Sequence, residues 1–223
     1  MGKLGKNPSR NQRTTIFISL TSLIVFLIIV LLKSSFAAMD ANVNSWSVSI
    51  HSDALTQIAK VIHYGFDTTS LFAISMVIAA YLFYKKYRSD ALLLGVTILA
   101  DVAIIEIVKM LVRFPRPLNG IVNESGFSFP SGHVTSTIVL FGLLTYFIWK
   151  HWKSADAKIL SSLFFVVIVI VVGFDRIYLN VHWLSDVLGS LPLGVFVLAF
   201  SMLAFQHLRR LKSRTNTLMS QKI

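Results

Sequence analysis

The chain has 223 residues, of which 55% are hydrophobic and 14% are charged, and its mean hydropathy is +0.70. Soluble domains carry about 25% charged residues, so this composition excludes an ordinary soluble enzyme and indicates an integral membrane protein. The length predicts one domain, residues 1–223. Because the chain has no cysteine, it can form no disulfide and has no thiolate nucleophile or thiolate metal ligand. The net charge of +11 would suggest nucleic acid as the partner of a soluble protein, but here the positions of the charges indicate membrane topology and an anion site, and no nucleic acid.

Six stretches are apolar enough and long enough to predict membrane-spanning helices, since a span needs about 20 mostly apolar residues. In chain order they are Ile16–Leu32, Thr68–Tyr84, Ala91–Val112, Val134–Trp149, Ile159–Phe174 and Asp186–His207. The first stretch could instead be the apolar region of a signal peptide, but it is long and a weak cleavage site follows it, so we expect a retained helix. The predicted fold class is an all-α integral membrane protein with six transmembrane helices.

Residues 34–67, between the first two spans, contain apolar side chains at roughly helical spacing. These are Ala54, Leu55, Ile58, Ala59, Val61 and Ile62. The pattern predicts a helix, which is either an amphipathic helix at the membrane interface or a linker helix packed on the bundle.

Lysine and arginine are unevenly divided between the two sides that the spans define. Fifteen of the 21 lie on the side of both termini and six lie on the other side. Because cytoplasmic loops carry an excess of these residues, both termini are predicted in the cytoplasm and the loops around 113–130 and 175–185 outside. This pattern suits a bacterial plasma membrane, with anionic lipid headgroups as neighbours.

His182 and Asp186 are four residues apart, a spacing that places two side chains on one face of a helix. The carboxylate can then accept the proton of one imidazole nitrogen, which leaves the other nitrogen free to attack phosphorus. The alternative is that the pair only caps a helix.

Pro130, Ser131, Gly132 and His133 directly precede an apolar helix. Ser131 is a good N-cap residue, and Gly132 allows the backbone to approach a ligand closely. Free N–H groups at a helix start bind anions, and His133 in the first turn could protonate a leaving oxygen. Taken alone, the same residues would form only a turn.

Three cations, Lys109, Arg116 and Arg176, accompany these histidines at the ends of spans. Arginine forks fit phosphate oxygens and lysine acts as a point charge, whereas any one of the three alone could be a cation at the membrane interface. His133, His182 and Asp186 could also pass for a metal site, but three nearby cations disfavour a dication and favour a phosphate. We therefore expect neither a metal nor another cofactor.

Three motifs within residues 109–186, in this order, resemble the signature of the type 2 phosphatidic acid phosphatase (PAP2) superfamily. They are Lys109-x6-Arg116-Pro117, Pro130-Ser131-Gly132-His133 and Arg176-x5-His182-x3-Asp186. The resemblance implies a haloperoxidase-like helical bundle in which His182 is the nucleophile, Asp186 orients it and His133 is the general acid. It also implies that the phosphate is held by Lys109, Arg116, Arg176 and the backbone of Ser131 and Gly132.

The third motif departs from the family pattern at Asp175, where a serine is usual. A carboxylate beside a phosphate repels it, so we expect Asp175 to pair with Arg176 or to point away. Within the third span, Glu106 is expected to pair with Lys109 or Arg113, and Asp101 to face a polar seam. The histidines outside the motifs, which are expected to have no catalytic role, are His51, His63, His151 and His207.

These observations predict a membrane phosphatase that acts at the outer face of the plasma membrane. The expected substrate is a lipid phosphate or pyrophosphate. By resemblance the first choice is undecaprenyl pyrophosphate, followed by phosphatidylglycerophosphate and phosphatidic acid. The alternative is a non-hydrolytic protein of the same fold that binds or transports a lipid phosphate, although binding alone would need only the cations and not His182, Asp186 and His133.

The topology can be tested because the chain has no cysteine of its own. We expect Asn123→Cys to react with a membrane-impermeant thiol reagent in intact cells, and Ser154→Cys to react only after lysis. The wild-type chain is the unlabelled control. The reverse labelling pattern would place the motif loops in the cytoplasm.

Overall fold

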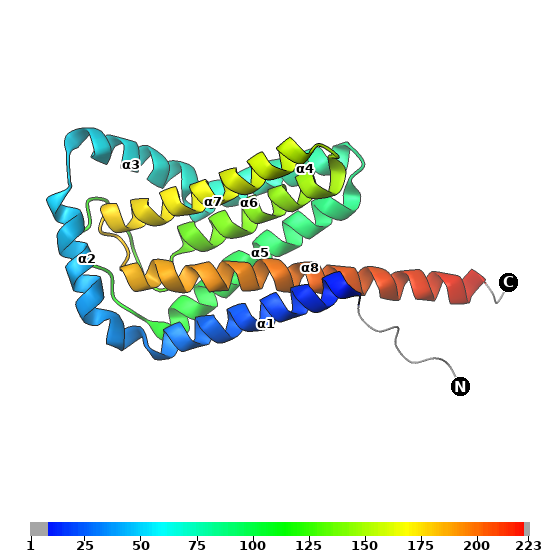
Figure 1. Ribbon diagram of the computed structural model, residues 1–223, viewed down its shortest axis with the longest axis horizontal. Helices are drawn as coiled ribbons and strands as arrows, with labels where there is room; N and C mark the ends of the chain where they lie inside the picture. Colours follow the sequence, from blue (N-terminus) through cyan, green and yellow to red (C-terminus); the bar gives the residue numbers. More distant parts are fainter. Residues whose placement is uncertain (1–8, 221–223) are drawn as a thin grey trace.

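The computed structural model describes the backbone of residues 9–220 and the side chains of residues 9–211. This part of the chain is helical and contains no strand. Its elements are α1 (Arg10–Leu31), η1 (Lys33–Phe36), α2 (Ala37–Ser49), α3 (Asp53–Phe66), α4 (Thr68–Tyr84), α5 (Arg88–Val112), α6 (Gly132–His151), α7 (Ala155–Tyr178) and α8 (Leu184–Ser220). The long helices run along the long axis of the molecule, and α2 and α3 lie at the end away from both termini (Figure 1).

Five helices can each cross a membrane by length and composition, namely α1, α5, α6, α7 and residues Leu184–Leu211 of α8. The remaining predicted span, Thr68–Tyr84, coincides with α4, which has 17 residues. Helices α3 and α4 meet the same requirement together and are bent by 50° between them. The predicted all-α membrane bundle is confirmed, with a sixth span when this bent pair is counted as one.

Helix ends differ from the predicted spans because apolar content marks the membrane core, whereas capping groups fix where a helix begins. Helix α1 begins at Arg10, where Ser9 and Gln12 form a capping box. Helix α7 begins at Ala155, capped by Ser154, and continues to Tyr178. The prediction that residues 175–185 form a loop was therefore wrong at its start, because this part belongs to the last turn of α7.

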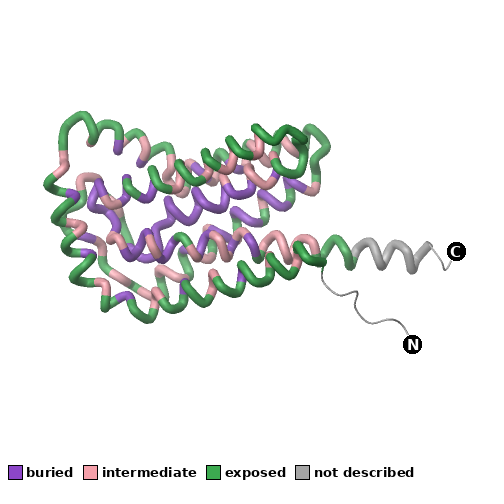
Figure 2. The backbone as a smooth tube through the Cα atoms, in the orientation of Figure 1, coloured by how far each residue is buried: buried purple, intermediate pink, exposed green. Residues whose placement is uncertain are grey.

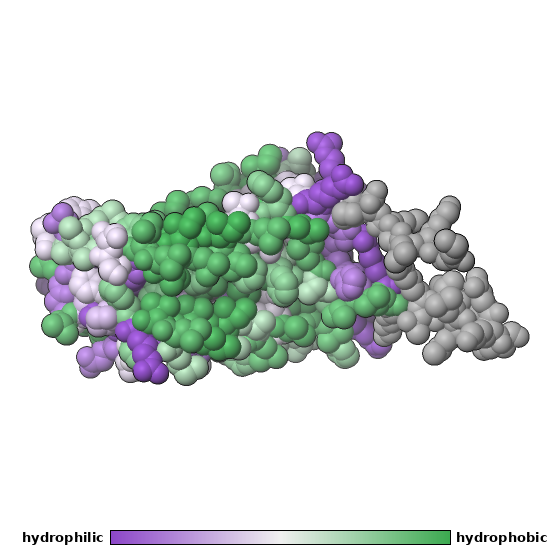
Figure 3. All heavy atoms as spheres, turned by 90° about the horizontal axis from the view of Figure 1, so that it is seen from below, coloured by the Kyte–Doolittle hydropathy of each residue, from purple (hydrophilic) through white to green (hydrophobic). Residues whose placement is uncertain are grey.

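Helix α6 is the centre of the bundle. Twelve of its 20 residues are buried, whereas α1 buries only Ser19 and Phe26. Figure 2 shows this contrast along the chain, and Figure 3 shows a broad hydrophobic belt between more polar ends. The exposed apolar side chains thus suit a lipid environment, and the protein is a multi-pass membrane protein.

The segment before α6 is clamped between α1 and α8. The Phe129 ring stacks on Phe26 of α1, with 5.9 Å between the ring centroids. On the other side it lies so close to α8 that a methyl group at Gly189 would be 2.4 Å from the ring. The cis peptide bond Phe129–Pro130 then leads into α6. This packing fixes the start of α6 at the end of the bundle that holds the motifs.

The helix predicted in residues 34–67 is present as α3, and a second helix, α2, precedes it. One face of α3 packs on α7 through Ala59, as expected for a linker helix. Leu55, Ile58 and Val61 of α3 are exposed. An apolar cavity of about 330 Å³ lies between α3 and α7, and Asp175 contributes to its wall.

Candidate active site

The three motifs meet at one end of the bundle, where the connection between α5 and α6, the end of α7 and the turn before α8 lie beside α2 and α3 (Figure 1). His133, Arg176, His182 and Asp186 are all buried there, and Arg176 is 0% exposed. Arg116 reaches the same place from the connection after α5, since its guanidinium touches His182. The structure thus brings together five of the eight predicted site residues through their side chains.

His182 and Asp186 form the predicted pair, but in a different local structure. His182 lies in the turn before α8, and Asp186 is the third residue of that helix. The Asp186 Oδ2 atom lies 3.4 Å from His182 Nδ1 and also accepts the backbone N–H of Trp183 at 2.8 Å. The carboxylate therefore caps α8 and faces the imidazole at once. The helix cap and the histidine–aspartate pair, which the sequence allowed as alternatives, are both present. A proton on Nδ1 would leave Nε2 with a free lone pair.

The Nε2 atom of His182 faces Arg116, whose NH1 lies 3.2 Å away. The same NH1 donates to the carbonyl oxygen of Val181 at 2.9 Å, and the rest of the guanidinium donates to the carbonyls of Ser125 and Gly126. Burial lowers the pKa of His182 to about 4, with the hydrogen bond to Asp186 opposing this shift and Arg116 adding to it. At neutral pH His182 is thus an uncharged imidazole, the form that can act as a nucleophile.

Arg176 joins several elements through one buried guanidinium. Its Nε donates to Asp175 Oδ2 at 3.0 Å, and its NH2 forms a second, shorter bond to the same oxygen. Its NH1 lies 2.7 Å from His63 Nδ1 and 2.8 Å from His133 Nε2. The predicted pairing of Asp175 with Arg176 is confirmed, and the carboxylate holds the arginine in place.

Ser131 and Gly132 have roles in packing that the sequence did not indicate. Ser131 precedes α6 but makes no side-chain cap bond. Its N–H donates to Ser190 Oγ of α8 at 2.8 Å, and its Oγ is buried without a partner among the described residues. A methyl group at Gly132 would lie 2.6 Å from Thr68 Oγ1, so glycine is needed for contact with α4.

Lys109 lies in the last turn of α5, and its Nζ is 3.1 Å from Glu106 Oε1. The predicted ion pair is present, and it directs the ammonium toward Glu106. Arg113 ends α5 with a positive φ of 52° and donates to the carbonyl of Met110, so it is not part of this pair. Asp101 is buried and accepts a hydrogen bond from Ser136 Oγ at 2.6 Å, which forms the expected polar seam between α5 and α6.

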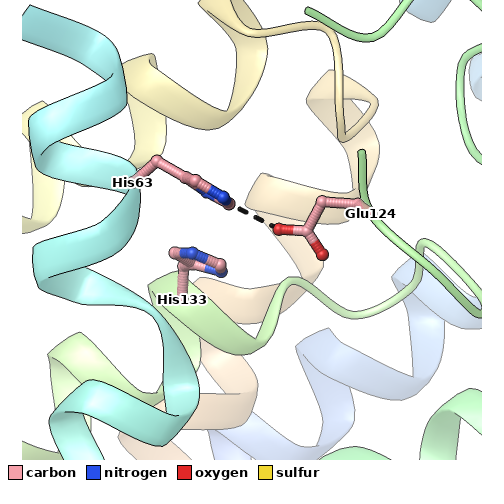
Figure 4. Close-up of side chains that lie close together, drawn as sticks. All are labelled: His63, Glu124 and His133. Atoms are coloured by element: carbon pink, nitrogen blue, oxygen red, sulfur yellow. Dashed lines mark ion pairs between the residues drawn. The ribbon is translucent and has the colours of Figure 1, made fainter. Parts of the chain in front are cut away.

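Two residues that the sequence did not assign to the site lie in the centre of the cluster (Figure 4). They are His63, for which no catalytic role was expected, and Glu124, which was not considered. The His63 ring stacks on His133 with 5.3 Å between the centroids. Glu124 Oε1 lies 3.7 Å from His63 Nδ1 and 3.5 Å from Arg176 NH1, and its Oε2 lies 3.3 Å from Arg116 NH2. Glu124 could have been suspected as a carboxylate in a loop between cationic motifs, whereas nothing local in the sequence marks His63.

The donor atoms of His63, Glu124 and His133 lie within 4.8 Å of one another, the one such cluster among the described residues. The donor atoms of His133, His182 and Asp186, which the sequence also allowed as a metal site, do not form such a cluster. The NH1 of Arg176 contacts both imidazoles and approaches the carboxylate. The atoms that could bind a metal ion are therefore already paired with a permanent cation. An anion between Arg116 and Arg176 suits this arrangement better than a dication.

The sequence model of the PAP2 superfamily matches residues 90–210, more than half of the chain, and the chain belongs to this superfamily. It is a PAP2 lipid phosphatase, as the motifs predicted. Phosphatidylglycerophosphatase B of Bacillus subtilis (strain 168) is 29% identical over 160 residues, which cover 71% of this chain and 79% of that protein.

Two solved structures share the fold. The crystal structure of a transmembrane PAP2-type phosphatidylglycerolphosphate phosphatase from Bacillus subtilis superposes with a TM-score of 0.78 at 26% identity, covering 83% of this chain and 94% of that one. The structure of Aquifex aeolicus LpxE superposes with a TM-score of 0.56 at 20% identity, covering 74% of this chain and 93% of that one.

Glu124 occupies N–H groups of the two arginines that an anion would need. We expect Glu124→Gln to lower the inhibition constant of orthovanadate about threefold to tenfold, since the competing charge is removed but the shape is kept. Asp53→Asn, at the exposed start of α3, is the control and should leave inhibition unchanged. Weaker inhibition of Glu124→Gln would instead show that the carboxylate helps the arginines to bind the anion.

Proposed function

We propose that the protein hydrolyses a lipid phosphate at the outer face of a bacterial plasma membrane through a phosphohistidine at His182. The observation that supports this most is the orientation of the His182 ring. Its Nδ1 faces Asp186 and its Nε2 lies 3.2 Å from Arg116 NH1. A phosphate bound by that guanidinium would replace the hydrogen bond between arginine and histidine and would meet the lone pair of Nε2.

In the first step, Nε2 of His182 forms a bond to phosphorus and the bond from phosphorus to the lipid oxygen breaks. The leaving oxygen takes a proton from His133, so the lipid alcohol leaves uncharged. For this role His133 Nε2, which lies 2.8 Å from Arg176 NH1, would take up a proton when the bound phosphate dianion takes over that N–H group. Arg116 and Arg176 stabilise the negative charge on the phosphoryl oxygens.

In the second step, a water oxygen attacks phosphorus and gives a proton to His133 while the bond between phosphorus and nitrogen breaks. Inorganic phosphate leaves, His182 returns to its neutral form and His133 regains the proton used in the first step. The balance consumes one water molecule and needs no redox partner. Asp186 keeps the proton of His182 on Nδ1 throughout, which stabilises the positive imidazole of the intermediate.

Phosphatidylglycerophosphate is the substrate that the comparisons favour, since the names of the Bacillus subtilis relative and of the Bacillus subtilis crystal structure refer to it. A lipid substrate also agrees with the apolar cavity between α3 and α7, whose wall includes Asp175 beside Arg176. Undecaprenyl pyrophosphate, the first choice from the sequence, has no such support and is retained as a member of the test panel. A purely binding or transporting protein would have no use for the His182–Asp186 pair.

The substrate and the nucleophile can be tested in one assay of phosphate release in detergent, with phosphatidylglycerophosphate, phosphatidic acid and undecaprenyl pyrophosphate. We expect the highest kcat/KM with phosphatidylglycerophosphate and a loss of at least about a thousandfold in His182→Ala, because no other nucleophile can replace the imidazole. His207→Ala, at the other end of the bundle, should keep full activity. Substantial turnover by His182→Ala would disprove the phosphohistidine.

The reaction is expected to need no metal, because Arg116 and Arg176 supply the positive charge that a metal would bring to the transition state. Purified protein should keep its activity after EDTA treatment, and orthovanadate should inhibit it. If EDTA abolished activity and an added dication restored it, the reaction would be metal-dependent and His63, Glu124 and His133 would be the first ligands to test.

A further inference from the structure

A buried lysine outside the three motifs lies against the aspartate of the His182–Asp186 pair. Lys33 is the first residue of η1, which follows α1 after Leu32, and its side chain is 3% exposed. Its Nζ lies 2.7 Å from Asp186 Oδ1. The superfamily match begins at residue 90, so Lys33 lies in a part of the chain that the match does not cover.

The two oxygens of Asp186 have separate partners. Oδ1 faces Lys33, whereas Oδ2 faces His182 Nδ1 and accepts the backbone N–H of Trp183. The distance of 3.4 Å from Oδ2 to Nδ1 is long, so the imidazole alone holds the carboxylate weakly. The ion pair with Lys33 therefore contributes to fixing the plane of the carboxylate and hence the direction of Oδ2.

Asp40 of α2 and Ser185 of α8 fix Lys33 in turn. Asp40 Oδ2 lies 3.5 Å from Lys33 Nζ. Asp40 also accepts two hydrogen bonds from Ser185, one from its N–H at 2.8 Å and one from its hydroxyl at 2.5 Å. Lys33 donates to the Ser185 hydroxyl as well. The ammonium thus connects η1, α2 and the first turn of α8.

Two aromatic rings complete the surroundings of the ammonium. Lys33 Nζ lies 4.1 Å from the centroid of Phe114 and 5.5 Å from that of Phe129. Such contacts attract a cation and are stronger where water is excluded. Phe114 is two residues before Arg116, and Phe129 is directly before Pro130. One side chain therefore contacts residues that belong to or adjoin all three motifs.

A buried ion pair is a poor device for stability alone, because the cost of removing the charges from water offsets much of their attraction. We propose that Lys33 is a positioning residue for the nucleophile. It holds Asp186 Oδ1, so that Oδ2 keeps the proton on Nδ1 of His182 and the lone pair of Nε2 points toward the phosphate. The other charged or titratable groups around the Lys33–Asp186 pair are Asp40, His182 and Arg116. This inference rests on the proposed role of His182.

The test is a double-mutant cycle of Lys33→Met and Asp186→Asn, measured as single-turnover release of the lipid alcohol by full-length protein in detergent. We expect Lys33→Met to lower the rate about tenfold to a hundredfold, a size typical of a misplaced catalytic group. Its KM and its inhibition by orthovanadate should change less than about threefold, since Arg116 and Arg176 are intact. In the Asp186→Asn background, Lys33→Met should cost less than about threefold.

Lys33→Arg, which keeps the charge, should recover part of the rate, and Lys153→Met, on an exposed cytoplasmic-side lysine, is the control for the substitution itself. If Lys33→Met does not give folded protein, Lys33→Gln takes its place in the cycle. Additive losses, or a loss that appears mainly in KM and vanadate inhibition, would overturn the positioning role. Failure of the proposed function would look different, since the wild-type protein would then show no turnover or His182→Ala would keep it.

Discussion

A fully buried guanidinium must find acceptors for its N–H groups inside the protein, and Arg176 imposes this constraint on the whole site. Its partners come from three separate parts of the chain besides its own helix: His63 from α3, His133 from α6 and Glu124 from the connection between α5 and α6. Asp175, its neighbour in α7, accepts hydrogen bonds from the Nε and NH2 groups of the same guanidinium. Helices α3, α6 and α7 meet at Arg176 because each supplies a hydrogen-bond acceptor for its buried N–H groups.

Two carboxylates neutralise the two arginines of the site, and this arrangement is compatible with an anion-binding site. Arg116 and Arg176 share Glu124, and Arg176 also has Asp175. Asp175 lies in the same helix as Arg176 and accepts hydrogen bonds from its Nε and NH2. Glu124 lies in a loop and contacts both arginines. In the proposed reaction an incoming phosphate would compete with Glu124 and would leave Asp175 where it is. On this proposal, a carboxylate can replace the usual serine because it is paired with Arg176.

The scaffold holds this cluster through close contacts at the end of α6. Gly132 allows Thr68 of α4 to approach, and Ser190 of α8 binds the backbone of Ser131 on both sides. The single proton of this hydroxyl is shared between the carbonyl oxygens of Ser131, at 3.2 Å, and Asp186, at 2.7 Å. Because His133 and Asp186 are thus placed relative to one another by the backbone, the proposed acid and the proposed nucleophile pair lie on a common rigid support.

The sequence by itself determined the membrane bundle and the chemistry of the motifs. The length of an apolar stretch is a local property, so the predicted span Thr68–Tyr84 has the same first and last residues as α4. Phosphate chemistry is indicated by residue types alone, at His182, Asp186, His133, Arg116 and Arg176. Only the tertiary structure decided that His63, Glu124 and Lys33 join the site. Their positions depend on how α3, a long loop and the end of α1 pack against distant helices, and such contacts between remote segments leave no periodic or spacing signal in the chain.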